Sequence, residues 1–128
     1  MQTTLGQIVD AEPALGRLLK ERLPIAQLYW ITELGGVLLE KIRAFRAQEF
    51  TLIVRDGLEQ PSGNWVIAPG MPQFAAFKAD VDTLRAIAVD LAWTPMDSAA
   101  MGAACASGED MLALRPFLTM APPKGDRP

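Results

Sequence analysis

Apolar residues recur at helical spacing along two long segments of the chain. The first segment runs from Pro24 to about Asp56, and its apolar positions advance in steps of three and four residues, with one glycine and one glutamate among them. These positions are Leu28, Ile31, Gly35, Leu38, Ile42, Phe45, Glu49 and Leu52. This heptad-like row predicts an amphipathic helix that begins after Pro24 and ends at Gly57.

The second segment repeats the pattern after a connector. Its apolar row comprises Phe74, Phe77, Val81, Leu84, Ala88 and Leu91. Lys78, Asp82 and Arg85 fall outside that row, as expected for the solvent side of a helix. Two helices with matching apolar rows are expected to return antiparallel as a helical hairpin with a coiled-coil-like interface.

The connector, "DGLEQPSGNWVIAPGMPQF", admits a structural and a functional interpretation. In the structural one, "PSGN" forms a turn, "WVIAP" is a short extended piece with Trp65 and Ile67 on one side, and Pro72 starts the next helix. The functional alternative is a ligand-binding loop. Its glycines lack the strand-before, helix-after setting and the spacing of a phosphate cradle, so the pattern favours the structural interpretation.

The two ends of the chain carry weaker patterns. Helical spacing from Thr4 to Arg22 is interrupted at Pro13, which predicts two short helices, the second starting near Glu12. After Leu91, the stretch "AWTPMDSAAMGAACASG" has no period and is expected to form an irregular strap. Ser107 and Asp110 resemble a capping box for a short helix that Pro116 helps to close.

The expected fold is therefore mainly α: an antiparallel helical hairpin with short N-terminal helices, an inter-helix loop containing a short extended or β piece, and a C-terminal strap plus short helix. Residues 1–118 are expected to form a single helical domain, and 119–128 a disordered tail. One domain is also what 128 residues accommodate.

Composition suggests a protein that binds other proteins. Half of the residues are hydrophobic and the mean hydropathy is +0.15, which is high for a small monomer with a large surface-to-volume ratio. The net charge of −3 and the pI of about 4.9 disfavour non-specific nucleic-acid binding. Self-association or a protein partner is expected instead.

Several classes of site are excluded by residue type. The chain has no histidine and a single cysteine, Cys105, so Ser-His-Asp triads, Cys-His pairs and an internal disulfide are excluded, and a zinc site is not expected. Cys105 is interpreted as a small packed or loop residue. Neither a signal peptide nor an apolar run of about 20 residues is present, so no membrane association is expected and the host cytoplasm is the expected site of synthesis.

Several carboxylates are candidate catalytic or metal-binding groups. Glu33 and Glu40 would stand about 10 Å apart along one helix, too far for a shared proton, and Arg43 offers Glu40 an ordinary surface ion pair. Glu49 sits in the apolar row and needs a partner, for which Arg46 and Arg85 are candidates. The aspartates at positions 80, 82 and 90 lack a metal-binding loop and are interpreted as solvated.

Aromatic and glycine residues in "LYWITELGGVLLE" indicate a candidate protein interface. Tyr29 and Trp30 are adjacent, so both cannot face the same neighbouring helix. Gly35 and Gly36 each lower helix stability by about 1 kcal/mol relative to alanine. This loss suggests an offsetting interaction, such as an intermolecular contact or close internal packing. The remaining predicted interface residues are the tryptophans Trp65 and Trp93, because large aromatics dominate interface energetics.

Several stretches together resemble a family of small bacteriophage and prophage proteins. These are "TLGQIVDAEPALGRLL", "LPIAQLYWITEL", "LLEKIRAFRAQEFTLIVRDG", "GNWVI", "FAAFKADVDTL" and "GEDMLALRPFL". The family pattern starts TL-x-x-(I/L)-V-x-A-x-PAL, and the resemblance covers about residues 3 to 118. It implies a phage origin and a helical hairpin, and it brings no catalytic residues. The stretches "TELGGVLL" and "RAIAVDLAW" are more apolar than the family's highly charged helices, which supports a surface buried in an assembly.

Three functions follow as hypotheses. The first is a non-enzymatic virion or assembly protein, located in the virion, that binds larger phage structural proteins, in a symmetric ring, in the portal, neck or tail region. The second is a phage-encoded regulator that docks on a host enzyme. The third, an enzyme, is disfavoured by the residue types present, and no cofactor is expected.

Overall fold

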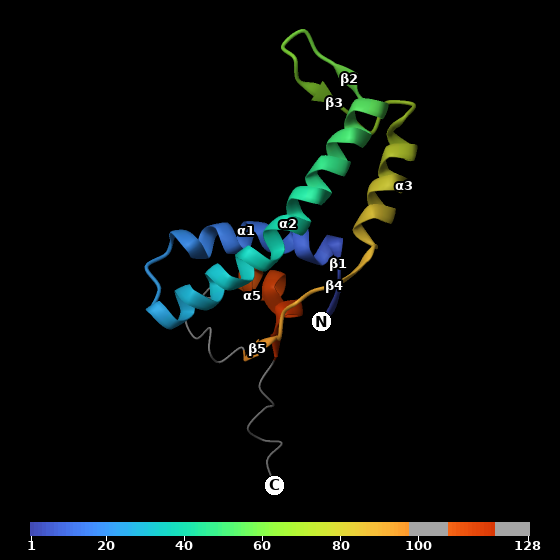
Figure 1. Ribbon diagram of the computed structural model, residues 1–128. Coiled ribbons are helices and arrows are strands. Elements are labelled where there is room, and N and C mark those ends of the chain that lie inside the picture. Colours follow the sequence, from blue (N-terminus) through green and yellow to red (C-terminus); the bar gives the residue numbers. More distant parts are fainter. Residues whose placement is uncertain (98–107, 120–128) are drawn as a thin grey trace.

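The computed structural model describes residues 1–97 and 108–119 and is mainly helical, which confirms the predicted fold class (Figure 1). Its helices are α1 (Leu5–Lys20), α2 (Ile25–Asp56), α3 (Phe74–Arg85) and α5 (Gly108–Leu114), and the 3-10 turn η2 (Arg115–Phe117) follows α5. The strands are short: β1 (Gln2–Thr4), β2 (Leu58–Glu59), β3 (Trp65–Val66), β4 (Ala88–Asp90), β5 (Met96–Asp97) and β6 (Leu118–Thr119).

The N-terminal segment forms one continuous helix, so the prediction of two short helices was wrong. A capping box starts α1, because the Thr4 hydroxyl accepts from the Gln7 backbone N–H and the Gln7 side chain accepts from the Thr4 N–H. Pro13 lies inside the helix on its exposed side, while Ala14 and Leu15 beside it are buried. Packing of that buried face holds the helix together across a residue that interrupts its hydrogen bonds.

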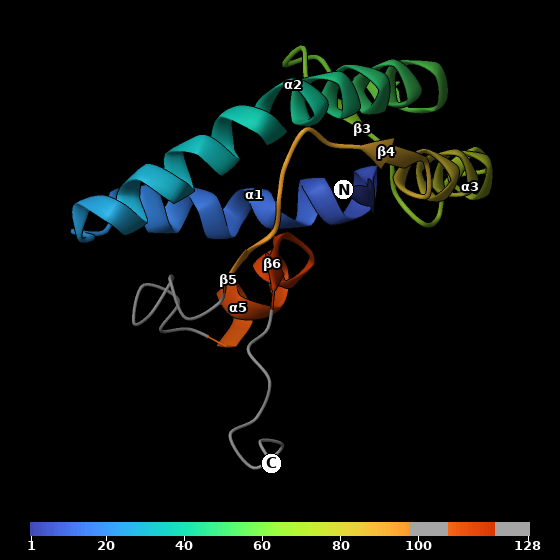
Figure 2. The same cartoon turned by 60° about the horizontal axis from the view of Figure 1, so that its bottom comes forward.

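The core lies mainly between α1 and α2. The short link after α1 turns the chain so that α2 returns across it, and α2 packs more extensively on α1 than on α3 (Figures 1 and 2). Of the predicted row, Ile31, Leu38, Ile42 and Phe45 are buried, and Leu34 is buried where Gly35 was expected. The apolar row of α2 was therefore predicted well, but the helix that mainly covers it was not.

The second helix of the predicted pair is shorter than expected. α3 runs antiparallel beside the C-terminal half of α2, as predicted, but it ends at Arg85 (Figure 1). Ala88 belongs to β4, which pairs antiparallel with β1 in the register Thr4 to Ala88. None of the α3 residues is buried.

The connector between α2 and α3 is a β-hairpin with the predicted turn and extended piece, but α3 begins at Phe74 and not at the predicted Pro72. β2 pairs antiparallel with β3, and Gly63 at the turn has a φ of +87°, a conformation that favours glycine. Gly57 ends α2 as predicted, at a φ of −88° that other residues also adopt. Glycine is needed there for space, since a Cβ would lie 2.5 Å from the Ile53 carbonyl oxygen and 2.9 Å from that of Val66.

The C-terminal segment packs back onto α1. α5 contacts α1, and β6 pairs parallel with β5 (Figure 2). The short helix predicted before Pro116 is thus confirmed. Predictions about the strap, the Ser107 cap, Cys105 and the tail fall mostly or entirely on residues 98–107 and 120–128, outside the described residues.

Candidate protein-interaction surface

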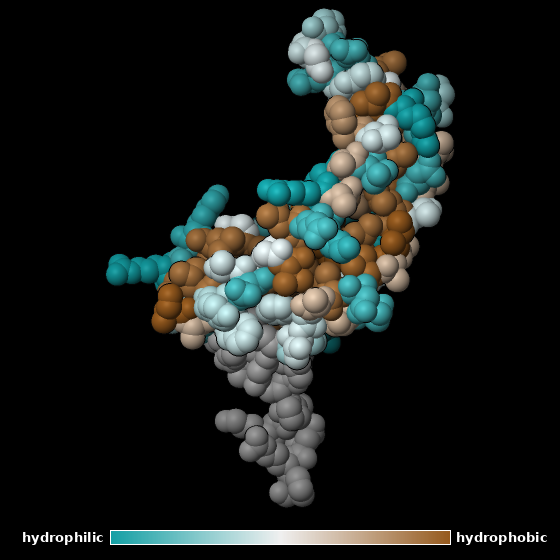
Figure 3. Space-filling view, in the orientation of Figure 1, coloured by the Kyte–Doolittle hydropathy of each residue, from teal (hydrophilic) through white to brown (hydrophobic). Residues whose placement is uncertain are grey.

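Large apolar side chains remain exposed on the described surface. Figure 3 shows hydrophobic residues along the face of α2 and α3 turned to the viewer, interrupted by hydrophilic ones. The exposed large residues are Leu19, Ile25, Tyr29, Trp30, Leu39, Phe50, Val54, Leu58, Val66, Ile87 and Leu112. Exposed apolar residues grouped on one helix mark candidate binding surfaces.

Three of the predicted interface residues form one aromatic cluster. Tyr29 and Trp30 lie near the start of α2 with their ring centroids 5.6 Å apart, edge to face. Trp30 makes a second edge contact, at 6.2 Å, with Trp93 from the segment between β4 and β5. Tyr29 is 57% exposed and Trp30 41% exposed, so the cluster presents apolar surface to solvent.

The cluster is held in place by contacts distant in sequence. The indole N–H of Trp93 donates to the Phe117 carbonyl at 3.2 Å, and Phe117 is itself buried. Just before Trp93, the carbonyl of Leu91 accepts from the N-terminal ammonium of Met1 at 2.7 Å. Met1 and Phe117 thus fix the segment between β4 and β5 that carries Trp93, which lowers the entropic cost of using the cluster in binding.

Gly35 and Gly36 are not explained by close packing within the chain. A Cβ built at either position would meet no atom within 4 Å. Gly36 is exposed and Gly35 is half-buried. The internal packing explanation is therefore wrong for both glycines.

Trp65 does not join the other predicted interface residues. It is half-buried in β3, and the β2–β3 hairpin lies at the opposite end of α2 from its N-terminus (Figure 1). Its half-buried environment, shared with Ile67 two residues on, matches the predicted extended piece with one covered side.

Sequence reasoning missed four exposed apolar residues on α2: Ile25, Leu39, Phe50 and Val54. The signal was present, because they lie three or four residues, or a multiple of a helical turn, from one another on the side away from Ile31 and Ile42. Because α2 has apolar residues on two sides, one apolar face remains exposed after the other side has packed into the core.

Ion pairs fix the helices around this surface. Arg46 of α2 binds Glu12 of α1 at 3.0 Å and Glu49 at 3.2 Å, and these hydrogen bonds, that of Glu12 first, raise the pKa of Arg46. Arg46 was predicted as the partner of Glu49, and this is confirmed. Arg85, the other candidate, binds Asp10 at 2.8 Å instead.

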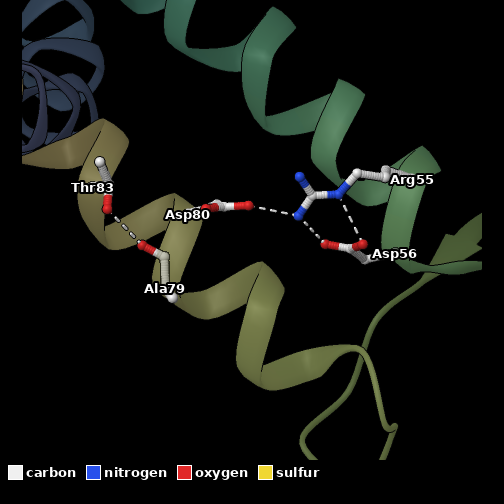
Figure 4. A network of polar contacts seen from close by, with 5 residues as sticks. All are labelled: Arg55, Asp56, Ala79, Asp80 and Thr83. Atoms are coloured by element: carbon white, nitrogen blue, oxygen red, sulfur yellow. Dashed lines mark hydrogen bonds and ion pairs between the residues drawn. The ribbon is translucent and has the colours of Figure 1, made fainter.

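A second network joins the far end of α2 to α3 (Figure 4). Arg55 binds Asp56 at 2.6 Å and Asp80 at 2.7 Å. The hydrogen bonds from Arg55 hold the pKa of Asp56 below its ordinary value, against the opposing effect of its burial. Asp80 is thus part of a structural ion pair, and Asp82 likewise pairs with Lys78 at 2.8 Å.

The two carboxylates that were candidates for catalysis lie on the surface of α2. Glu33 and Glu40 are both exposed, and the ion pairs of the described residues do not include the predicted one between Glu40 and Arg43. Within residues 1–97 and 108–119, no group of three or more acidic or cysteine side chains is placed to hold a metal ion. Over the same residues, no helix has the length and apolar character needed to span a membrane.

The molecule therefore offers an apolar surface with a fixed aromatic cluster as its candidate functional site. Tyr29, Trp30 and Trp93 come together, Trp65 stands apart, and Gly36 lies exposed further along the same helix. No protein-family model, no curated protein and no solved structure matches the chain.

Proposed function

We propose that the protein is a non-enzymatic bacteriophage structural or assembly protein that binds larger virion subunits in the portal, neck or tail region. The observation that carries this proposal is the exposed aromatic cluster of Tyr29, Trp30 and Trp93. Aromatic residues in a pre-organised cluster are the side chains that contribute most to protein interfaces. The phage setting is supported by the resemblance over residues 3 to 118.

The mechanism is burial of the cluster by a neighbouring subunit. Removing apolar surface from water contributes about 25 cal/mol per Å². The rings of Trp30 and Trp93 already pack edge to face, with their centroids 6.2 Å apart, so few rotamers need to be ordered when the partner binds. In a symmetric ring, each copy would present the same cluster to an equivalent neighbour.

Mass spectrometry of purified phage particles tests the proposal. Particles from phage encoding the unchanged chain are expected to contain it at a fixed stoichiometry, and particles from phage encoding Trp30→Gln are expected to lose most of it. Ile87→Gln is the matched control, because Ile87 is also exposed but lies beyond α3. That variant should be incorporated normally.

A chain absent from particles would overturn the virion role. Recovery of the same chain in complex with a host enzyme, dependent on Trp30, would then support the alternative of a phage-encoded regulator. Equal incorporation of Trp30→Gln and the unchanged chain would remove the aromatic cluster as the binding surface.

A further inference from the structure

We propose that a second copy of this chain packs antiparallel against the outward face of α2. The face is formed by exposed residues that recur every three or four positions on the side away from Ile31, Leu38 and Phe45. This outer stripe consists of Ile25, Tyr29, Thr32, Gly36, Leu39, Arg43, Ala47, Phe50 and Val54. Its spacing is that of a helix–helix seam, and no other element of the described chain covers it.

Apart from Leu39, the outer stripe has the same spacing read in either direction. A two-fold axis passing between Leu39 and Glu40 brings residues of one helix level with different residues of the other. The level pairs are Ile25 with Val54, Tyr29 with Phe50, Thr32 with Ala47, Gly36 with Arg43, and Leu39 with Glu40. Apolar residues thus meet apolar residues toward both ends, and the aromatic rings of Tyr29 and Phe50 face each other.

Charge complementarity favours a second copy over an unrelated helix. Arg43 of one copy comes level with Gly36 of the other, and Glu33 and Glu40 stand one turn to either side of that glycine. None of these three charged side chains has an ion-pair partner within the described chain. The pairing would neutralise each Arg43 with two carboxylates, twice per dimer.

Gly36 supplies the space that this arrangement needs. Its missing side chain leaves a hole in the stripe, and a Cβ there would meet nothing within 4 Å in the isolated chain. An arginine side chain from the second copy fills such a hole as a knob. The pairing thereby accounts for a glycine that is otherwise unfavourable in a helix.

A parallel arrangement fits the same residues less well. It would place Arg43 against Arg43 and Glu40 against Glu40, like charges with no compensating partner level with them.

α2 also curves (Figures 1 and 2), and long helices usually curve with the convex side toward solvent. The two copies would therefore cross, with their closest approach at the midpoint where Gly36 and Arg43 lie.

Sedimentation equilibrium of the purified full chain over a range of concentrations tests the pairing. The unchanged chain is expected to be a dimer, and Gly36→Leu is expected to dimerise roughly tenfold or more weakly because it fills the hole. Gly16→Leu is the matched control: Gly16 is an exposed glycine of α1 with nothing within 4 Å, and its substitution should leave the dimer intact.

Charge reversal provides a variant that should fold in either case. Arg43→Glu places a third carboxylate between Glu33 and Glu40 of the second copy, so a monomer is expected. Combining it with Glu33→Arg and Glu40→Arg restores opposite charges across the axis and should restore the dimer. An unchanged chain that is monomeric at every concentration, a single reversal that leaves the dimer intact, or a triple variant that remains monomeric overturns the proposal.

Cysteine cross-linking tests the direction of the pair. In a Cys105→Ser background, Leu39→Cys lies beside the two-fold axis and should form a disulfide with the same residue of the second copy. Two copies of Thr32→Cys should not cross-link to each other. Thr32→Cys should cross-link to Ala47→Cys when the two variants are mixed. Self-linking at Thr32→Cys would show a parallel pair and contradict the proposed one.

The proposed dimer shares Tyr29 with the aromatic cluster, but it is tested separately from the proposed phage function. It is measured on purified protein and depends on Gly36 and Arg43, whereas incorporation into particles is predicted to depend on Trp30. A dimer absent from particles would leave the pairing intact and remove the virion role, and a monomer present in particles would do the opposite.

Discussion

Arg17 of α1 binds Asp110 of α5 across 93 residues of sequence. The guanidinium Nε donates to Asp110 Oδ1 at 2.9 Å, and Nη2 donates to the same oxygen. Asp110 is buried, so its charge depends on this partner, while Arg17 remains half-exposed. The hydrogen bonds raise the pKa of Arg17, which stays protonated throughout the range in which proteins are studied. This pair holds α5 against α1.

Asp110→Asn should release α5 without unfolding α1 and α2. The amide cannot balance the charge of Arg17, so local opening of α5 becomes easier. Hydrogen exchange measured by mass spectrometry should speed up in residues 111–118 and stay slow in the buried part of α2. Asp82→Asn, which removes an exposed pair within α3, is the control and should leave exchange in α5 unchanged. Unchanged protection of α5 in Asp110→Asn would contradict the role given to this pair.

Adjacent leucines at the end of α1 should differ sharply in their contribution to stability. Leu18 is 1% exposed and Leu19 is 46% exposed. Leu18→Ala leaves a cavity in the core and should lower the free energy of unfolding by about 2–5 kcal/mol. Leu19→Ala should change it by no more than about 0.5 kcal/mol. Urea titrations of both variants test the assignment of the core face, and similar losses would show that the face is wrong.

Stability should fall in acid partly through Asp56. Arg55 holds the pKa of Asp56 below its ordinary value in the folded chain. The unfolded chain therefore binds the proton first, at about pH 3.9, and the stabilisation present above that pH is lost as the pH falls through the lower folded pKa. Asp56→Asn removes this titration, so its free energy of unfolding should decline less steeply between neutral pH and pH 3.

Removing the arginine gives a second check on the same pair. In Arg55→Gln, Asp56 can still take up a proton, but the guanidinium that lowers its pKa is gone. The decline in stability with acid should therefore be shallower in this variant too. If both variants follow the acid dependence of the unchanged chain, the pair makes no contribution to it.

Gly57→Ala should destabilise the junction between α2 and the β-hairpin. The new Cβ would press on the carbonyl oxygens of Ile53 and Val66, both backbone atoms that cannot rotate away. We expect a loss of about 1–3 kcal/mol in the free energy of unfolding. Gly70→Ala, in the same connector but with nothing within 4 Å, should be neutral or slightly stabilising. Thermal denaturation of the two variants side by side distinguishes these outcomes.

Local patterns were sufficient to predict where most helices lie. The row through Ile31 and Phe45 marks the buried side of α2, and Pro24 and Gly57 mark its ends, because periodicity and helix-breaking residues act within a few residues of where they occur. The turn chemistry around Gly63 was predictable for the same reason. The capping box of Thr4 and Gln7 was also readable from the sequence, but it was overlooked.

Tertiary partners were less predictable. Two helices, α1 and α3, both offered apolar rows to α2, and sequence spacing does not say which packs more closely. The pairing of β1 with β4 joins the start of the chain to residue 90, a non-local contact that leaves no local pattern. At the interaction surface, Tyr29 and Trp30 were identifiable from their adjacency, whereas the contact with Trp93 depends on the same long-range folding.

Pro13 offers the clearest test of why the N-terminal prediction failed. Because α1 is continuous, Pro13→Ala restores a backbone N–H inside the helix and removes the ring's clash with the preceding turn, so the variant should be more stable by about 1–3 kcal/mol. If a separate helix began near Glu12, Pro13 would occupy a first-turn position that favours proline, and its loss would be neutral or destabilising. The sign of the change in the free energy of unfolding, measured by urea titration, decides between these alternatives. Because the side chain of Pro13 is exposed, lost core packing does not confuse the result.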